Sequence, residues 1–211
     1  MTRTGMAILL CSAMMVPAAI YSRGAATSPD GPQERLKAAT DFAAIGDPAS
    51  RSQAIFTEMG KVIQSPRCLN CHPRTDQPTQ GDALLPHEPP VTRGADGHGA
   101  PGLACATCHG PANVTFANGT GSIPGHPDWH LAPREMAWQG KTLAEICRQI
   151  KDPARNGNKS LADLVEHHGK DKLVGWAWHP GQGRKPAPGT QAQFGALTEA
   201  WIDSGAHCPS K

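Results

Sequence analysis

The sequence has few large apolar residues for a globular protein of its length. Leu, Ile, Val and Phe make up about 15% of the 211 residues, below the roughly 20% typical of chains that build a packed core. Gly and Pro number 23 and 20, which favours loops over long regular elements. The net charge is only +2, whereas disorder combines low hydrophobicity with high net charge. We therefore expect disulfides, metals or a large apolar cofactor to organise the fold.

Three other features are missing from the sequence. The 20 Lys and Arg form no basic run and are balanced by 18 Asp and Glu, so nucleic acid is not an expected partner. No fixed repeat period is visible, which excludes collagen and long coiled coils. The longest uncharged apolar run, residues 6–20, is shorter than the roughly 20 residues that a membrane-spanning helix needs.

The N-terminal residues are typical of a secretory signal peptide. Arg3 precedes the apolar run, and small residues follow it around Ala18 and Ala26 as possible cleavage sites. An uncleaved membrane anchor is the alternative. We expect a signal peptide at 1–26, a flexible segment at 27–48 and one domain at 49–211. The mature protein is then expected in the periplasm, with no membrane span.

Two copies of the pattern C-x-x-C-H follow in the expected domain. The first contains Cys68, Cys71 and His72, and the second contains Cys105, Cys108 and His109. This pattern is the signature of covalent attachment of c-type haem. Two thiols three residues apart on a helical turn can each form a thioether with a haem vinyl group, and the histidine becomes the proximal ligand of the iron. The sequence therefore predicts two covalently attached haems.

Two other uses of the cysteine pairs are weaker interpretations. A zinc site built from both pairs would separate them by about 15–20 residues, whereas 33 residues intervene here. A thioredoxin-like redox pair requires a preceding strand in a βαβ unit, and neither pair follows a strand pattern. A histidine directly after each pair is required only by the haem interpretation.

Hydrophobic spacing and capping residues predict a helical protein with long loops. We expect helices over 50–64, from Thr142 with Glu145 completing a capping box, over 160–168, and from Thr190 with Gln193 as its box partner. Gly205 is the expected C-terminal cap of the last helix. Residues 73–101 show no credible helix or strand.

This order of elements resembles class I cytochromes c. In that family an N-terminal helix leads to the attachment motif and a C-terminal helix crosses the first. The resemblance implies an all-α fold, with the second motif in an insertion. Only 37 residues separate Cys68 from Cys105, far less than two cytochrome domains in tandem would require, so we expect both haems close together in one unit.

The ligands on the far side of each iron are less clearly indicated. Met136 lies in an irregular stretch, and is either the distal ligand of the second haem or a gap-filling methionine. His179 lies about where class I cytochromes place their distal ligand, so the resemblance makes it the candidate for the first haem. The rival loop histidines are His87, His98, His126 and His130. His168 is interpreted as a core histidine, His167 and His207 as surface residues, and Met59 as a core methionine.

Cys11 lies in the expected signal peptide, so Cys147 and Cys208 are the cysteines of the mature protein that remain outside the motifs. An oxidising compartment favours a disulfide between them, which would tie the helix at Thr142 to the C-terminus. Two free buried thiols are the alternative.

A narrower resemblance covers about two-thirds of the chain. It rests on the stretches at 68–73, 93–99, 129–133 and 151–157. They resemble small dihaem c-type proteins of proteobacteria labelled as isoquinoline 1-oxidoreductase subunits. The resemblance implies redox partner proteins, among them a molybdenum hydroxylase, and electron transfer from such a dehydrogenase toward the respiratory chain. The alternative function is a small dihaem peroxidase with one open iron.

Overall fold

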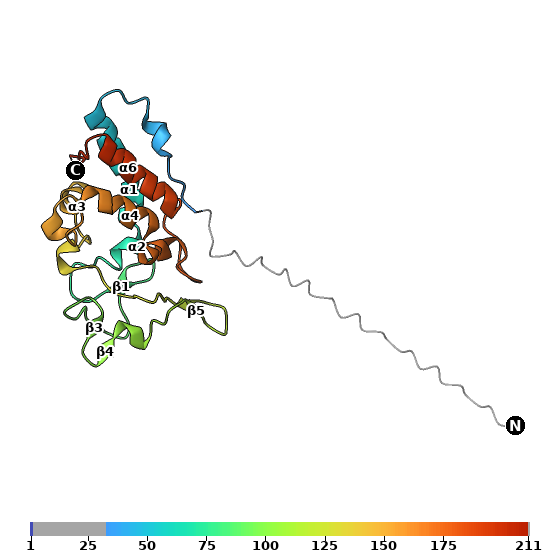
Figure 1. The fold of residues 1–211 in the computed structure, drawn as a ribbon. Coiled ribbons are helices and arrows are strands. Elements are labelled where there is room, and N and C mark those ends of the chain that lie inside the picture. Colours follow the sequence, from blue (N-terminus) through green and yellow to red (C-terminus); the bar gives the residue numbers. More distant parts are fainter. Residues whose placement is uncertain (2–32, 211) are drawn as a thin grey trace.

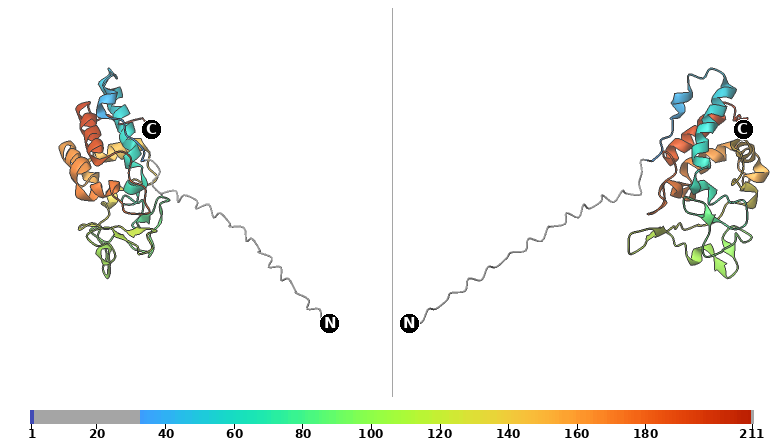
Figure 2. Two further views of the ribbon diagram at one scale, coloured as in Figure 1. Left: turned by 90° about the vertical axis from the view of Figure 1, so that its right-hand side faces the viewer. Right: turned by 180° about the vertical axis from the view of Figure 1, so that it is seen from behind.

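The computed structural model describes residue 1 and residues 33–210. The rest of the expected signal peptide and residues 27–32 lie outside the described residues. The helices gather at one end of the molecule, and irregular chain with short strands forms the other end (Figures 1 and 2). The α-helices are α1 (Pro48–Ile63), α2 (Pro66–Leu69), α3 (Leu143–Ile150), α4 (Leu161–Lys170), α5 (Lys172–Gly175) and α6 (Gln191–Asp203). The 3-10 helices are η1 (Ala39–Phe42), η2 (Cys105–Thr107), η3 (Arg134–Met136), η4 (Pro153–Arg155) and η5 (Trp176–Trp178).

The strands form three separate antiparallel pairs, each with two residues per strand. They are β1 (Thr79–Gln80) with β2 (Leu85–Pro86), β3 (Gly99–Ala100) with β4 (Leu103–Ala104), and β5 (Val114–Thr115) with β6 (Ser122–Ile123). All of these lie in the connection between α2 and α3. The sequence predicted no strand there, because pairs of two residues are too short to show an alternating pattern.

Local capping explains where the longer helices begin. The side chains of Thr142, Ser160 and Thr190 accept hydrogen bonds from the backbone N–H groups three residues later. The sequence predicted this capping at Thr142 and Thr190, whereas at Ser160 it predicted only the start of a helix. Helix α1 begins two residues earlier than expected, because Asp47 caps it and Pro48 occupies its first position. Gly205 follows α6 with a φ of 103°, which confirms its predicted role at the helix end.

Helix α6 packs against both α1 and α4 and forms the centre of the apolar core. The rings of Phe56 on α1 and Trp201 on α6 have centroids 4.9 Å apart. Ser52 donates a hydrogen bond from its hydroxyl to the carbonyl of Trp201, at 3.0 Å. The contact between the first and last helices that the resemblance implies is therefore present.

Two glycines allow α4 and α6 to approach each other closely. A Cβ atom placed on Gly195 of α6 would lie 2.6 Å from the Cα atom of Gly169 on α4. Real Cβ atoms do not approach backbone atoms so closely. The two helices can therefore touch only because neither residue has a side chain.

The ends of the described chain are attached to this helical core. Cys147 and Cys208 form a disulfide across 61 residues of sequence, with Cα atoms 5.6 Å apart, which confirms the predicted pairing. Residues 33–48 belong to the segment expected to be flexible, yet Leu36 and Phe42 are buried in the core. Burial of those two side chains holds this part of the segment against the helices. Within the described residues, no helix has the length and apolar character that a membrane crossing requires.

Candidate functional site

Each C-x-x-C-H motif folds into the same tight helical turn. In the first motif the N–H groups of Cys71 and His72 both donate to the carbonyl of Cys68, at 3.1 and 3.0 Å. In the second motif, the N–H groups of Cys108 and His109 donate to the carbonyl of Cys105 at 3.2 and 3.0 Å. The turn brings both thiols and the imidazole of one motif to the same cavity.

The two turns have different supports in the fold. The first continues from α1 through α2, which begins at Pro66. The second coincides with η2 and follows the β3–β4 hairpin, where the N–H of Cys105 donates to the carbonyl of His98 at 2.8 Å. Gly99 has a φ of 101°, and a Cβ there would lie 2.8 Å from the backbone nitrogen of Cys105. Glycine at this position therefore lets the hairpin close on the second motif.

Both motif histidines are held in one tautomer. The Nδ1 atom of His72 lies 2.8 Å from the carbonyl oxygen of Met136, and that of His109 lies 2.8 Å from the carbonyl oxygen of Pro124. A carbonyl can only accept, so each Nδ1 carries the proton and donates it. The lone pair on Nε2 is then free to bind a metal, and a hydrogen bond of this kind orients ligating histidines generally.

A tryptophan supports each motif histidine from one side. The rings of His72 and Trp138 are parallel to within 4°, with centroids 3.6 Å apart. The rings of His109 and Trp129 are stacked at 4.8 Å and 18°. The two sites thus share a cysteine turn, an imidazole hydrogen-bonded to a backbone carbonyl, and a stacked indole, although their surrounding segments differ.

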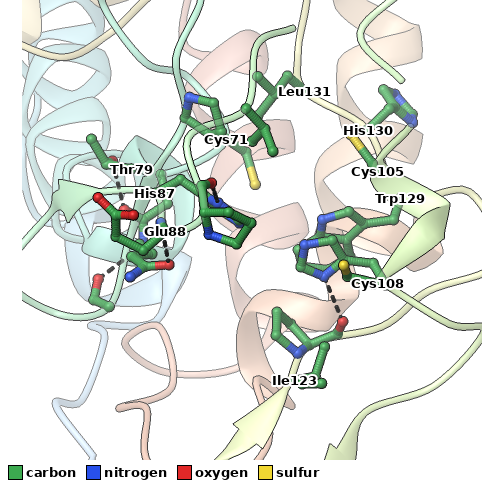
Figure 3. Close-up of a pocket in the computed structure, with 18 of the residues that line it drawn as sticks. Cys71, Thr79, His87, Glu88, Cys105, Cys108, Ile123, Trp129, His130 and Leu131 are labelled. Atoms are coloured by element: carbon green, nitrogen blue, oxygen red, sulfur yellow. Dashed lines mark hydrogen bonds between the residues drawn. The ribbon is translucent and has the colours of Figure 1, made fainter. Parts of the chain in front are cut away.

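Each motif opens into a cavity of a size that ligand sites commonly have. The first-motif cavity, which contains Cys68, Cys71 and His72 in its wall, has a volume of about 610 Å³. The second-motif cavity, with Cys105, Cys108 and His109 in its wall, has a volume of about 350 Å³ (Figure 3). Cofactor and ligand pockets generally fall between about 300 and 1,000 Å³.

The two cavities share part of their walls. Four residues line both of them: Arg67, Cys71, His130 and Trp176. Groups bound in the two cavities would therefore lie next to each other. This arrangement is compatible with the expectation, drawn from the short spacing of the motifs, that both cofactors belong to one unit.

Burial keeps the thiols of the first motif protonated at pH 7. Burial raises the pKa of Cys68 to about 12 and that of Cys71 to about 11. A thiol–disulfide redox pair instead has one cysteine with a lowered pKa. Burial also lowers the pKa of His72 to about 4, so its imidazole is neutral at pH 7 and able to bind a metal.

The cysteine pairs do not converge on one metal position. Among residues 33–210, the only group of three or more potential ligand side chains close enough to hold one ion is His98, Asp128 and His130. A zinc site that takes its ligands from both cysteine pairs is therefore not formed.

Buried donors in the cavity walls fit a group that carries carboxylates. Arg67 is buried in the shared wall, where its Nη2 pairs with Asp82 at 2.5 Å while its Nε and Nη1 have no hydrogen-bond partner. The indole Nε1 of Trp138, in the wall of the first-motif cavity, is also without a partner. Unpaired buried donors are costly, and the propionates of a haem would satisfy them. The residues present therefore fit the expected cofactor.

The structure places the two candidate distal ligands differently from expectation. Met136 is buried and lines the first-motif cavity rather than the second, and its carbonyl holds His72. His179 is exposed and lines neither cavity. Its backbone carbonyl accepts a hydrogen bond from Asn113. Neither residue is thus brought to the haem for which the sequence proposed it.

Other histidines line the cavities instead: His87, His126, His130, His167 and His168. His87 lies in the wall of the second-motif cavity (Figure 3). His168 lies in the wall of the first-motif cavity and is buried, which confirms the predicted burial on the apolar face of α4. Met59 is fully buried and lines neither cavity, as expected for a core methionine. The sequence offered no sign that Trp129 and Trp138 would stack on the motif histidines.

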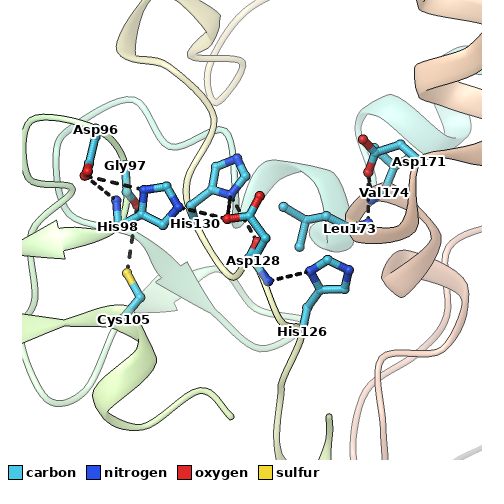
Figure 4. A network of polar contacts seen from close by, with 10 residues as sticks. All are labelled: Asp96, Gly97, His98, Cys105, His126, Asp128, His130, Asp171, Leu173 and Val174. Carbon is cyan, nitrogen blue, oxygen red and sulfur yellow. Dashed lines mark hydrogen bonds and ion pairs between the residues drawn. The ribbon is translucent and has the colours of Figure 1, made fainter. Parts of the chain in front are cut away.

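An exposed polar network adjoins the second motif (Figure 4). The Nε2 of His98 lies 2.9 Å from a carboxylate oxygen of Asp128, and its Nδ1 lies 3.5 Å from Asp96. His130 also contacts Asp128, at 3.4 Å. The hydrogen bond with Asp128 raises the pKa of His98.

Comparison with known proteins adds no relative: the chain matches no family model, no curated protein and no solved structure.

Proposed function

We propose that this chain is a dihaem c-type cytochrome that transfers electrons in the periplasm. The observation that carries the proposal is the repeated site. The two C-x-x-C-H turns have the same backbone hydrogen bonds. Each turn presents two thiols and a histidine with a free Nε2 to a cavity, and the two cavities share a wall.

The residues of each site have separate tasks in this proposal. Cys68 and Cys71 would hold one haem through thioether bonds, and Cys105 and Cys108 the other. His72 and His109 would ligate the two irons. Each bound haem supplies a one-electron couple between Fe(III) and Fe(II).

The surrounding protein would position the cofactors and tune their potentials. The carbonyl groups of Met136 and Pro124 fix the motif imidazoles and increase their basicity as ligands. Arg67 would place a positive charge beside both haems, because it lines both cavities. The shared wall would keep the electron-transfer distance between the two irons short.

The compartment and the partners are further parts of the proposal. The disulfide between Cys147 and Cys208 is typical of an oxidising compartment such as the periplasm. The electron donor would be a dehydrogenase or molybdenum hydroxylase, as the sequence resemblance implies, and electrons would pass toward the respiratory chain.

Redox titration of the purified holoprotein tests electron transfer. We expect two one-electron steps per chain, and no turnover of hydrogen peroxide. Rapid peroxide turnover would contradict the proposal in favour of the peroxidase alternative. The double variant Cys105→Ser/Cys108→Ser should retain one step, and Cys147→Ser should retain both, because Cys147 lies outside the motifs.

A further inference from the structure

The inference below rests on the proposed function and concerns the second axial ligand of each iron. We propose that His87 ligates the haem of the second motif, opposite His109, and that His168 ligates the haem of the first motif, opposite His72. Both sites would then be closed, bis-histidine sites.

The position of His87 relative to His109 carries the first assignment. Their ring centroids lie 5.9 Å apart, with 62° between the ring planes. Two imidazoles bound on opposite sides of one metal ion, each through a metal–nitrogen bond of about 2 Å, have ring centres roughly 6 Å apart. The angle between the planes is no obstacle, because each ring can rotate about its bond to the metal.

The tautomer of His87 also suits ligation. Its Nδ1 lies 2.9 Å from the carbonyl oxygen of Pro89, so this nitrogen carries the proton and donates it. The Nε2 atom then has a free lone pair, as in His109. His87 is thus oriented by the same kind of hydrogen bond, from Nδ1 to a backbone carbonyl, as both motif histidines.

A different observation carries the assignment of His168. Its Nδ1 lies 2.9 Å from the hydroxyl oxygen of Thr198 on α6, and that hydroxyl donates its own proton to the carbonyl of Phe194 at 2.9 Å. The hydroxyl oxygen must therefore accept from His168, which places the proton on Nδ1 and leaves Nε2 free.

His168 is also rigidly placed in the first-motif cavity. The ring is only 4% exposed and stacks on Phe194, with centroids 4.6 Å apart. His72 lies in the wall of the same cavity. A buried imidazole with a free Nε2 in the cavity is what an axial ligand requires.

The other candidates lack a free ring nitrogen in the right place. His98 has a carboxylate at each ring nitrogen. His126 lines the first-motif cavity, but its Nδ1 accepts a hydrogen bond from the N–H of Asp128, which leaves the proton of the neutral ring on Nε2. The backbone of Met136 lies at the Nδ1 edge of His72, on the side of the ring away from the Nε2 that would face the iron. Two histidines in the cavity walls remain as rivals: His130, which lines both cavities, and His167, which lines the first and pairs with Asp171 at 3.3 Å.

The experiment for the second motif uses holoprotein produced in a host that attaches haem c. His87→Ala should keep two haems per chain and convert one of them from low spin to high spin, as seen by absorption and electron paramagnetic resonance. Added imidazole should restore the low-spin state. The matched control His130→Ala should remain low spin at both haems. A low-spin His87→Ala protein, or a high-spin His130→Ala protein, would overturn the assignment.

The experiment for the first motif compares His168→Ala with His167→Ala in the same way. We expect one high-spin haem only in the His168 variant, and the reverse result would overturn the assignment. If His87→Ala or His168→Ala loses haem, the variants His87→Met and His168→Met test the same ligands. Each should give one methionine-ligated haem with a raised potential, and unchanged potentials would refute the ligand concerned.

The wild-type protein separates this inference from the proposed function. Absence of covalent haem from the wild type would refute both. Two covalent haems whose spin states do not respond to any of these variants would refute only the ligand assignments.

Discussion

The close approach of α4 and α6 gives a quantitative prediction. Gly195 on α6 faces Gly169 on α4, and a Cβ at Gly195 would lie 2.6 Å from the Cα of Gly169. Ordinary van der Waals contact begins at about 3.4 Å, so Gly195→Ala must move the helices apart by nearly an ångström. Overpacking of this kind typically costs about 1–3 kcal/mol.

The expected cost is large relative to the total stability of a domain this size, about 5–15 kcal/mol. We expect urea unfolding of the holoprotein to report a loss of about 1–3 kcal/mol for Gly195→Ala. The same movement would lengthen the hydrogen bond from His168 to Thr198, so a change in the haem spectrum should accompany the loss.

A matched control exists in the same chain. A Cβ on Gly46 would have no atom within 4 Å, and the φ of this glycine is not positive. Gly46→Ala should therefore leave stability and spectrum nearly unchanged. Equal stability of the Gly195→Ala and Gly46→Ala proteins would refute the close packing of α4 on α6.

Three further predictions concern the disulfide, the exposed network and the shared wall. Replacing Cys147 and Cys208 by Ser should lower the free energy of unfolding by about 4 kcal/mol in the chain-entropy model, because the disulfide spans 61 residues. Urea unfolding with and without a reductant would measure this loss, and equal stability of the two proteins would contradict the prediction. By NMR, His98 should titrate above its ordinary pKa of 6.5, and its pKa should return toward that value in Asp128→Asn. Because the pKa of His98 is raised in the folded state, the pairing stabilises the fold fully below pH 6.5 and ceases to do so as the pH rises through the folded-state pKa. An unshifted titration would refute the pairing. Arg67→Gln should lower both reduction potentials in a spectroelectrochemical titration, because a positive charge beside both cavities favours Fe(II), and a change at only one haem would contradict the shared wall.

The sequence predicted the helices well because their signals are local. The capping pairs at Thr142 and Thr190 lie within four residues of sequence, and both are found as predicted. The disulfide between Cys147 and Cys208 was the one pairing left after the signal peptide and the motifs were assigned, and it is confirmed.

The surroundings of the cavities could not be predicted in the same way. The hydrogen bond from His72 to the carbonyl of Met136 spans 64 residues, and a backbone acceptor leaves no mark on the sequence. The interpretation of His168 as a core histidine was correct in its burial. Its place in a cavity wall follows from how α4 packs on α6, which depends on Gly169 and Gly195 and not on any motif.

The irregular connection between α2 and α3 was also only partly predictable. Its loop character followed from Gly and Pro content, but its three strand pairs and its stacked Trp129 and Trp138 depend on contacts between distant segments. Position along the chain was likewise a poor guide for His179, which lies outside both cavities.

Intact mass spectrometry of the purified holoprotein tests the central claim most directly. The account predicts a chain mass increased by two haems, both retained after denaturation and extraction with acidified solvent because thioether bonds hold them. A chain that carries no covalent haem, or only one, would contradict the account.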